Sequence, residues 1–379
     1  MSSSKACIYR TQQAISGLGT STKVLGGQDR TDPTAELGLH RTNNFPSSYF
    51  LDSDFFQPIS RDILTIHNGP FFLEQQRHFA AAGQAVRLAT MVGLHSPKDA
   101  KQLFMEPETW TLCEEQRRTW WAIVMLDRVV VAGSPQLLMA APDPSTNDLL
   151  PCNDDDWTNG RIGFNEALFT RNFHSPSSVG QFARVCQAVH MFGKVLRHIK
   201  AREKDTNPVE LTAEALQLHI VLVALDQGIM NNDFDIATTQ GSLHSALSLC
   251  SLARLLLYNE YACNEPSITT PRERLAAEVE MQQISLASIQ DIVSKTLPQM
   301  ARQIVSAGQQ QSKGPRHSPI LAGCLYHAAT ECAWFVRENN DAEMVVGLEA
   351  ITNALQVLKT EWSVCNEYMS YLEGSKAHS

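Results

Sequence analysis

Helical periodicity is the feature that most constrains the fold of this chain. Between residues 72 and 92, Phe79, Ala82, Val86 and Ala89 are three and four positions apart, which places them on one face of a helix. Alternating apolar and polar runs bounded by hairpin turns, which would indicate strands, are almost absent. The sequence predicts an all-α fold, a multi-helix bundle or array. After a helix that ends at Gly133, further helices are predicted over residues 178–202, 208–230, 241–261, 271–295, 318–338 and 341–371.

The composition changes along the chain and suggests three kinds of segment. Residues 1–48 are rich in Gly, Ser and Thr with weak periodicity, so we predict a flexible N-terminal tail. Residues 49–373 should form the all-α domain, and residues 308–319, GQQQSKGPRHSP, an internal flexible loop. Gly93 followed by Leu94 is typical of a left-handed helix C-cap. Thr111-Leu-Cys-Glu114 predicts a capping box at the start of the next helix.

Charge and cysteine content narrow the function classes. The 379 residues carry a net charge of −9 and no basic stripe, which disfavours DNA binding by this chain alone. The nine cysteines are scattered and never form a C-x-x-C pair, which is typical of reduced thiols in the cytosol or nucleus. We expect no signal peptide and no membrane span, because there is no continuous apolar run of the required length.

The stretch EEQRRTWWAIVMLDRV, residues 114–129, places charges inside an otherwise apolar helix. Helical spacing puts Trp120 and Trp121 in the interior and Asp127 close to the buried face. An unpaired buried carboxylate is costly, so Asp127 should have a partner. Our hypothesis is an ion pair with Arg87 of the preceding helix; the alternative is that Asp127 and Arg128 lie in solvent at the rim.

Three segments in the right order resemble the fungal-specific transcription factor domain, the middle homology region of zinc-cluster regulators. They are GQAVRLATMVGLH (83–95), EEQRRTWWAIVMLDRVVVAGSP (114–135) and DLLPCNDDDW (148–157), within a motif core of residues 63–157. The resemblance implies an all-α regulatory domain in which the motif residues are structural determinants and not catalysts. The motif residues are Arg87, Gly93, His95, Arg117, Arg118, Trp120, Trp121, Asp127, Arg128, Gly133, Pro135 and Pro151.

The sequence departs from the family pattern in two places. Gly133-Ser134-Pro135 stands where the family usually has Gly-Arg-Pro. The family's zinc cluster needs six spaced cysteines, whereas the first hundred residues hold only Cys7, and one thiolate cannot hold two zinc ions. We therefore expect the zinc cluster to be absent and no cofactor to bind these residues.

The resemblance implies control of transcription in the nucleus, of metabolic or secondary-metabolite genes. Expected partners are the transcription machinery and a second regulator, as a homodimer or as a heterodimer with a zinc-cluster protein. A small-molecule effector between the helices is a further expectation; DNA would be contacted only indirectly, and no membrane is expected. The alternative is a co-regulator that acts through a partner's DNA-binding module.

Enzymatic and metal-binding interpretations have weaker support. Hydrolase and P-loop motifs are absent, and GLGTST (17–22) lacks the third glycine of a dinucleotide fingerprint. Cys324, His327 and Glu331 could share a helix face, but cysteines on apolar helices are usually core residues. The cluster Asp154-Asp155-Asp156 lacks the spacing of a calcium loop and is interpreted as a solvated acidic turn. We expect no enzyme, with an α-helical enzyme as the least favoured alternative.

Overall fold

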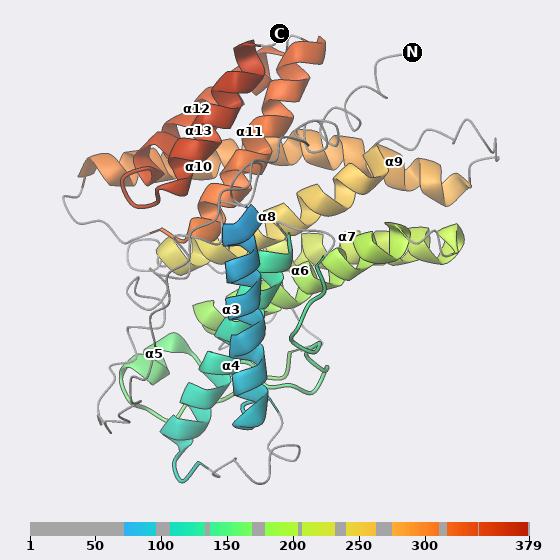
Figure 1. The fold of residues 1–379 in the computed structure, drawn as a ribbon. Coiled ribbons are helices and arrows are strands. Elements are labelled where there is room, and N and C mark those ends of the chain that lie inside the picture. Colours follow the sequence, from blue (N-terminus) through green and yellow to red (C-terminus); the bar gives the residue numbers. More distant parts are fainter. Residues whose placement is uncertain are drawn as a thin grey trace, which may run out of the picture.

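The computed structural model describes residues 72–95, 107–132, 137–168, 179–203, 207–231, 240–262, 275–310, 317–339 and 341–377. Within these ranges the fold is all-α, as predicted, and the only β feature is an isolated antiparallel bridge between Leu149 and Ala167 (Figure 1). The predicted tail, residues 1–48, lies outside the described residues, as do Gly133 and Pro135. The elements are α3 (Phe72–Met91), α4 (Trp110–Ala132), α5 (Asp154–Thr158), α6 (Gln181–Glu203), α7 (Pro208–Asn231), α8 (Gln240–Ala262), α9 (Ala276–Asp291), η2 (Ile292–Thr296), α10 (Leu297–Gln310), α11 (Pro319–Asn339), α12 (Ala342–Leu358) and α13 (Val364–Ala377).

The helices form a continuous series of packed neighbours. Helix α4 packs on α3 and α6, α6 on α8, α8 on α11, and α11 on α12. In Figure 1, α3, α4 and α5 lie at one end of the molecule and α11, α12 and α13 at the other. A single cluster of buried apolar residues extends from Val86 in α3 to Leu372 in α13. Helix α8 lies centrally, and its residues 244–255 are all buried, as expected of a helix surrounded by others.

The two predicted caps fared differently. Gly93 has a φ of 80°, and the Leu94 amide donates to the Ala89 carbonyl over 2.9 Å, which confirms the left-handed cap that only glycine adopts without strain. The capping box at Thr111 is wrong. Thr109 caps α4 instead, since its hydroxyl accepts from the Leu112 amide, and this starts the helix one residue before Thr111.

The helix predicted over 271–295 continues much further than expected. It begins at Ala276 as α9, widens into the π-helical turn η2, and runs on as α10 to Gln310. The wide turn lets the helix pass Pro298, which has no amide hydrogen for a regular helical bond. The Val293 carbonyl within η2 accepts the Cys332 thiol of α11 instead, at 3.4 Å. Helix α10 therefore includes residues 308–310 of the predicted loop, and residues 311–316 lie outside the described chain.

The single helix predicted over 341–371 is two helices in the structure. Helix α12 ends at Leu358 and α13 begins at Val364. Between them, the Trp362 indole donates to the His317 carbonyl over 2.7 Å, and the Glu361 carboxylate accepts from the His317 amide over 2.7 Å. These bonds to the start of α11 stabilise a turn that helical periodicity could not reveal.

Helix α7 passes a length-and-hydropathy test for a membrane span, contrary to the expectation from apolar run length. The most apolar part of its Pro208–Met230 segment has a mean hydropathy of 1.4, and 28% of that part is buried. One such helix is weak support for a span. Glu214 and Asp226 interrupt it, and both pair with basic or imidazole groups of neighbouring helices.

Candidate functional site

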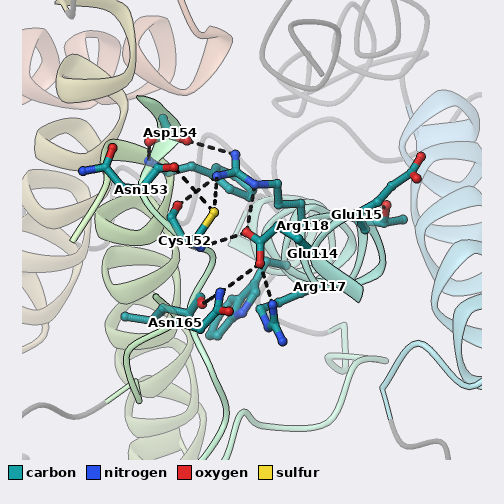
Figure 2. A network of polar contacts seen from close by, with 12 residues as sticks. Glu114, Glu115, Arg117, Arg118, Cys152, Asn153, Asp154 and Asn165 are labelled. Atoms are coloured by element: carbon teal, nitrogen blue, oxygen red, sulfur yellow. Dashed lines mark hydrogen bonds and ion pairs between the residues drawn. The ribbon is translucent and has the colours of Figure 1, made fainter. Parts of the chain in front are cut away.

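The buried carboxylate of Glu114 is the centre of a polar network formed by the motif (Figure 2). Glu114 is completely buried in the first turns of α4. Its oxygens accept from Arg118 Nε at 3.0 Å, from the Cys152 amide at 2.8 Å and from Asn165 Nδ2 at 2.8 Å, and also from Arg117. Four donors around one carboxylate compensate its loss of water.

Arg118 connects this carboxylate to a segment far away in sequence. Its Nη1 donates to Asp154 Oδ1 and its Nη2 to the Cys152 carbonyl, each at 2.9 Å. The guanidinium also lies 5.1 Å from the Trp157 ring centroid and 5.6 Å from that of Phe182. Burial alone would lower the pKa of Arg118, but the nearby Asp154 and Glu114 carboxylates outweigh it and raise the pKa.

Asp154 passes the connection on to α6. Its second oxygen, Oδ2, accepts from the Phe182 amide at 2.9 Å, in the first turn of α6, where amides have no helical partner. Gly180 allows this approach, because a Cβ there would lie 2.9 Å from the Asp154 nitrogen. The cluster predicted to be a solvated acidic turn instead starts a short helix, α5, capped by the Asn153 side chain.

A second network surrounds Asp127 and Arg128 at the other end of α4. Asp127 accepts from the amides of Ala140 at 2.9 Å and Ala141 at 3.2 Å, and it pairs with Arg128. Arg128, almost fully buried, donates Nη2 to the Ala141 carbonyl at 3.0 Å and to the Pro142 carbonyl at 3.2 Å. Burial lowers the pKa of Arg128, with the Asp127 carboxylate acting in the opposite direction.

The partner proposed for Asp127 from the sequence is therefore wrong. Arg87 lies exposed on α3, whereas the Asp127 carboxylate binds its neighbour Arg128 and two loop amides. The solvated alternative is wrong too, because Asp127 and Arg128 are both buried. Room for Arg128 comes from Gly193 of α6, where a Cβ would lie 2.9 Å from Arg128 Nε.

The tryptophan pair packs as predicted. Trp120 and Trp121 are both buried. The His95 ring stacks on Trp120 with centroids 4.8 Å apart, so the end of α3 is held against α4. Trp121 Nε1 donates to the Leu149 carbonyl at 3.1 Å, in the same segment that Arg118 binds. Pro151, also a motif residue, is buried in that segment.

The thiols in and around these networks are protonated and buried. Burial, with the Glu114 charge adding to it, raises the pKa of the Cys152 thiol to about 11, so it stays protonated. Burial raises the pKa of Cys324 to about 12, and in the part of the chain that is described no group of three His, Cys, Asp or Glu residues could hold a metal ion. Cys324, His327 and Glu331, considered above, are not gathered into such a group.

Sequence reasoning missed the residues that complete the networks. Asn165, Cys152 and Gly193 carry no motif signal by themselves. The signal was indirect: the six charged side chains on one apolar helix require partners, and the irregular segment between α4 and α6 has many backbone groups to satisfy.

Fold and networks together define a helical scaffold in which buried charges hold an irregular segment in place. A model of the family described as the fungal specific transcription factor domain matches residues 71–265, more than half of the chain. The chain belongs to this family, as the resemblance predicted. Comparison with curated proteins and with solved structures finds no match.

Proposed function

We propose that this protein regulates transcription in the nucleus by contacts with other proteins. The family match to residues 71–265 supports this, and it supports a regulator in preference to an enzyme. The observation that carries the proposal is the use of the motif's charges: Glu114, Arg118, Asp127 and Arg128 all bind backbone groups of the segment between α4 and α6. These four side chains are engaged in holding the segment against α4. Such a role suits a protein that acts by binding other proteins.

DNA reading is assigned to a partner or to a zinc cluster outside these 379 residues. Two features of the sequence support placing the DNA contacts elsewhere: the net charge of −9, and the absence of the six spaced cysteines of a zinc cluster. The partners we propose are the transcription machinery and a second regulator subunit. The target genes we propose are metabolic or secondary-metabolite genes, with a small-molecule effector as an additional input.

A tethering experiment tests the proposal. The whole chain is fused to a heterologous DNA-binding domain and assayed on a reporter gene in a fungal host. We expect the reporter output to change, and we expect Arg118→Met to reduce the change more than Arg117→Met at equal protein abundance. A reporter that ignores the wild-type fusion would overturn the proposal.

The co-regulator alternative makes a different prediction in a second assay. A co-regulator would change the reporter output only when a DNA-bound zinc-cluster regulator is also present, and the two proteins would co-purify. Tight sequence-specific DNA binding by the unfused chain would contradict both versions.

A further inference from the structure

Helix α7 carries two apolar faces: one packs into the core, and the other is mostly exposed, with Leu216 at its edge packed against the core cluster. The packed face contacts α6, α8 and α9. Its buried residues are Thr212, Ala215, Leu218, Leu222, Leu225 and Ile229. The second face points the other way, at helical spacings of four, three, four, three, four and three. We call it the α7 seam, and it consists of Val209, Ala213, Leu216, Ile220, Val223, Gln227 and Met230.

The α7 seam is open to solvent. The exposed fractions are 57% for Val209, 64% for Ile220 and 48% for Met230. Ala213 and Gln227 are also exposed, and the remaining two seam residues are half-buried. An average repeat of 3.5 residues keeps these side chains in line with a neighbouring helix, as in a coiled coil. A solvated helix face would normally be polar, so this stripe indicates a helical partner.

We propose that the α7 seam binds the α7 seam of a second copy of this chain, with the two helices antiparallel. The biological role of this dimer rests on the function proposed above. The physical argument for the dimer does not depend on that function. The seam has no charged residue, so two copies can meet without burying a charge. Self-pairing of one apolar patch produces a closed two-fold dimer.

The charges that flank the seam favour the antiparallel arrangement. Glu214 pairs with His198, and Asp226 pairs with Arg254, so both acids already have partners within the chain. Glu210 is exposed in the first turn of α7. In a parallel pair the two Glu210 side chains would lie at the same level along the axis, on opposite flanks of the interface. In an antiparallel pair centred near residue 218 they would lie about 24 Å apart along the axis, beyond the screening length in physiological salt.

An antiparallel pair centred near residue 218 also brings the largest aliphatic side chains of the two seams together. With the two-fold axis near residue 218, Leu216 lies beside Ile220 of the second copy, and Ala213 beside its Val223. Gln227 then lies towards the rim. A helix of 24 residues is about 36 Å long and offers fewer side chains than a standard stable interface, so we expect a weak dimer in the micromolar range.

Lipid is a less suitable occupant. Helices that lie on membranes usually carry Lys and Arg on their polar face, whereas α7 has neither and contains Glu210, Glu214 and Asp226. The same lack of basic residues argues against nucleic acid. A second protein helix with an apolar face would fit the α7 seam, because the seam is apolar and carries no charge.

The first test measures association of the whole chain by sedimentation equilibrium over a micromolar concentration series. We expect a monomer–dimer equilibrium, weakened about 100-fold by Ile220→Glu, because each interface would bury unpaired carboxylates. The matched control is Val346→Glu on α12, whose residue is 54% exposed and lies outside the seam. It should leave association unchanged, and both variants should unfold like the wild type.

The second test determines the direction of the helices. Chains with Ala213→Cys are mixed with differently tagged chains with Val223→Cys and oxidised, with the wild-type chain as background. The antiparallel pair brings these two positions together and should give disulfides between the two tags. Disulfides formed mainly between identical variants would indicate a parallel pair and overturn the arrangement.

The remaining outcomes separate the two proposals. A wild-type chain that stays monomeric at every concentration overturns the dimer, as does equal weakening by both glutamate variants, or binding to neutral vesicles that Ile220→Glu abolishes. A monomeric chain that still changes the tethered reporter leaves the proposed function intact. A dimer that leaves the reporter unchanged supports the α7 seam and contradicts the proposed function.

Discussion

Replacing Arg118 with methionine should destabilise the protein far more than the same change at Arg117. Both arginines bind the same carboxylate, Glu114, but their surroundings differ. The Arg118 side chain is 5% exposed and donates to Glu114, Asp154 and the Cys152 carbonyl. The Arg117 side chain is 21% exposed and donates to Glu114. The pair is a matched comparison within one turn of α4.

The magnitude follows from what each variant leaves behind. Arg118→Met removes the buried cation that Asp154 and Glu114 share, while Glu114 keeps the partly exposed Arg117. Breaking a buried ion pair costs about 3–5 kcal/mol. Arg117→Met leaves Glu114 with Arg118 and two neutral donors, so the cost should be about 1 kcal/mol or less. Urea unfolding followed by circular dichroism measures the free energy of unfolding of each variant.

A local readout accompanies the global one. Arg161 is exposed and lies in the segment that Arg118 holds, so trypsin should cleave after Arg161 faster in Arg118→Met than in Arg117→Met. Similar losses of stability for the two variants, within about 1 kcal/mol, would refute the view that Arg118 clamps this segment. So would unchanged cleavage at Arg161 in a destabilised Arg118 variant.

Three further predictions concern other buried groups, and urea unfolding measures each of them. Gly193→Ala should lower the free energy of unfolding by about 1–2 kcal/mol, because the new Cβ would press on Arg128. The control Gly83→Ala has open space around it and should stabilise the protein slightly. A stabilising Gly193→Ala would contradict the close packing of Gly193 against Arg128. Asp127→Asn should cost about 2–4 kcal/mol, because the buried Arg128 would keep only its longer contact of 3.4 Å with the partly exposed Asp143 carboxylate. A loss below about 1 kcal/mol would contradict the role of Asp127. Burial, with the nearby His317 adding to it, lowers the pKa of His244 to about 4, so between pH 6.5 and 4 the unfolded chain binds a proton that the folded chain does not. Stability should therefore fall as the pH falls through this window, by up to about 3 kcal/mol for this group, and His244→Phe should flatten that part of the pH profile.

Elements whose apolar residues share one face could be predicted from the sequence. The positions of α6, α7, α8 and α11 agree with their predicted ranges to within a few residues, since each has a long periodic stretch bounded by loop residues. Prediction failed where a tertiary bond decides the outcome. The turn that ends α12 depends on Trp362 reaching His317, and the Val293 carbonyl in the π-helical turn η2 accepts from a thiol 39 positions away in sequence.

The candidate site was predictable in its central residues and unpredictable in its partners. The burial of Trp120, Trp121 and Asp127 follows from helical geometry, and the structure confirms it. The partner of Asp127 could not be found in this way. We expected an ion pair between two helices. The backbone amides and carbonyls of the segment after α4 also need hydrogen-bond partners, and that expectation did not take them into account.

That backbone explains why α4 carries charges in its apolar part. Buried ion pairs add little stability over well-packed apolar side chains, so stability alone does not account for them. Residues 137–152 pass over α4 almost without secondary structure, and their buried amides and carbonyls need partners. Glu114 and Asp127 supply acceptors, while Arg118, Trp121 and Arg128 supply donors. Because these bonds are directional, they select one path for the segment where an apolar surface would allow many. The motif residues therefore fix the shape of a non-helical surface, as the contact function proposed above would require.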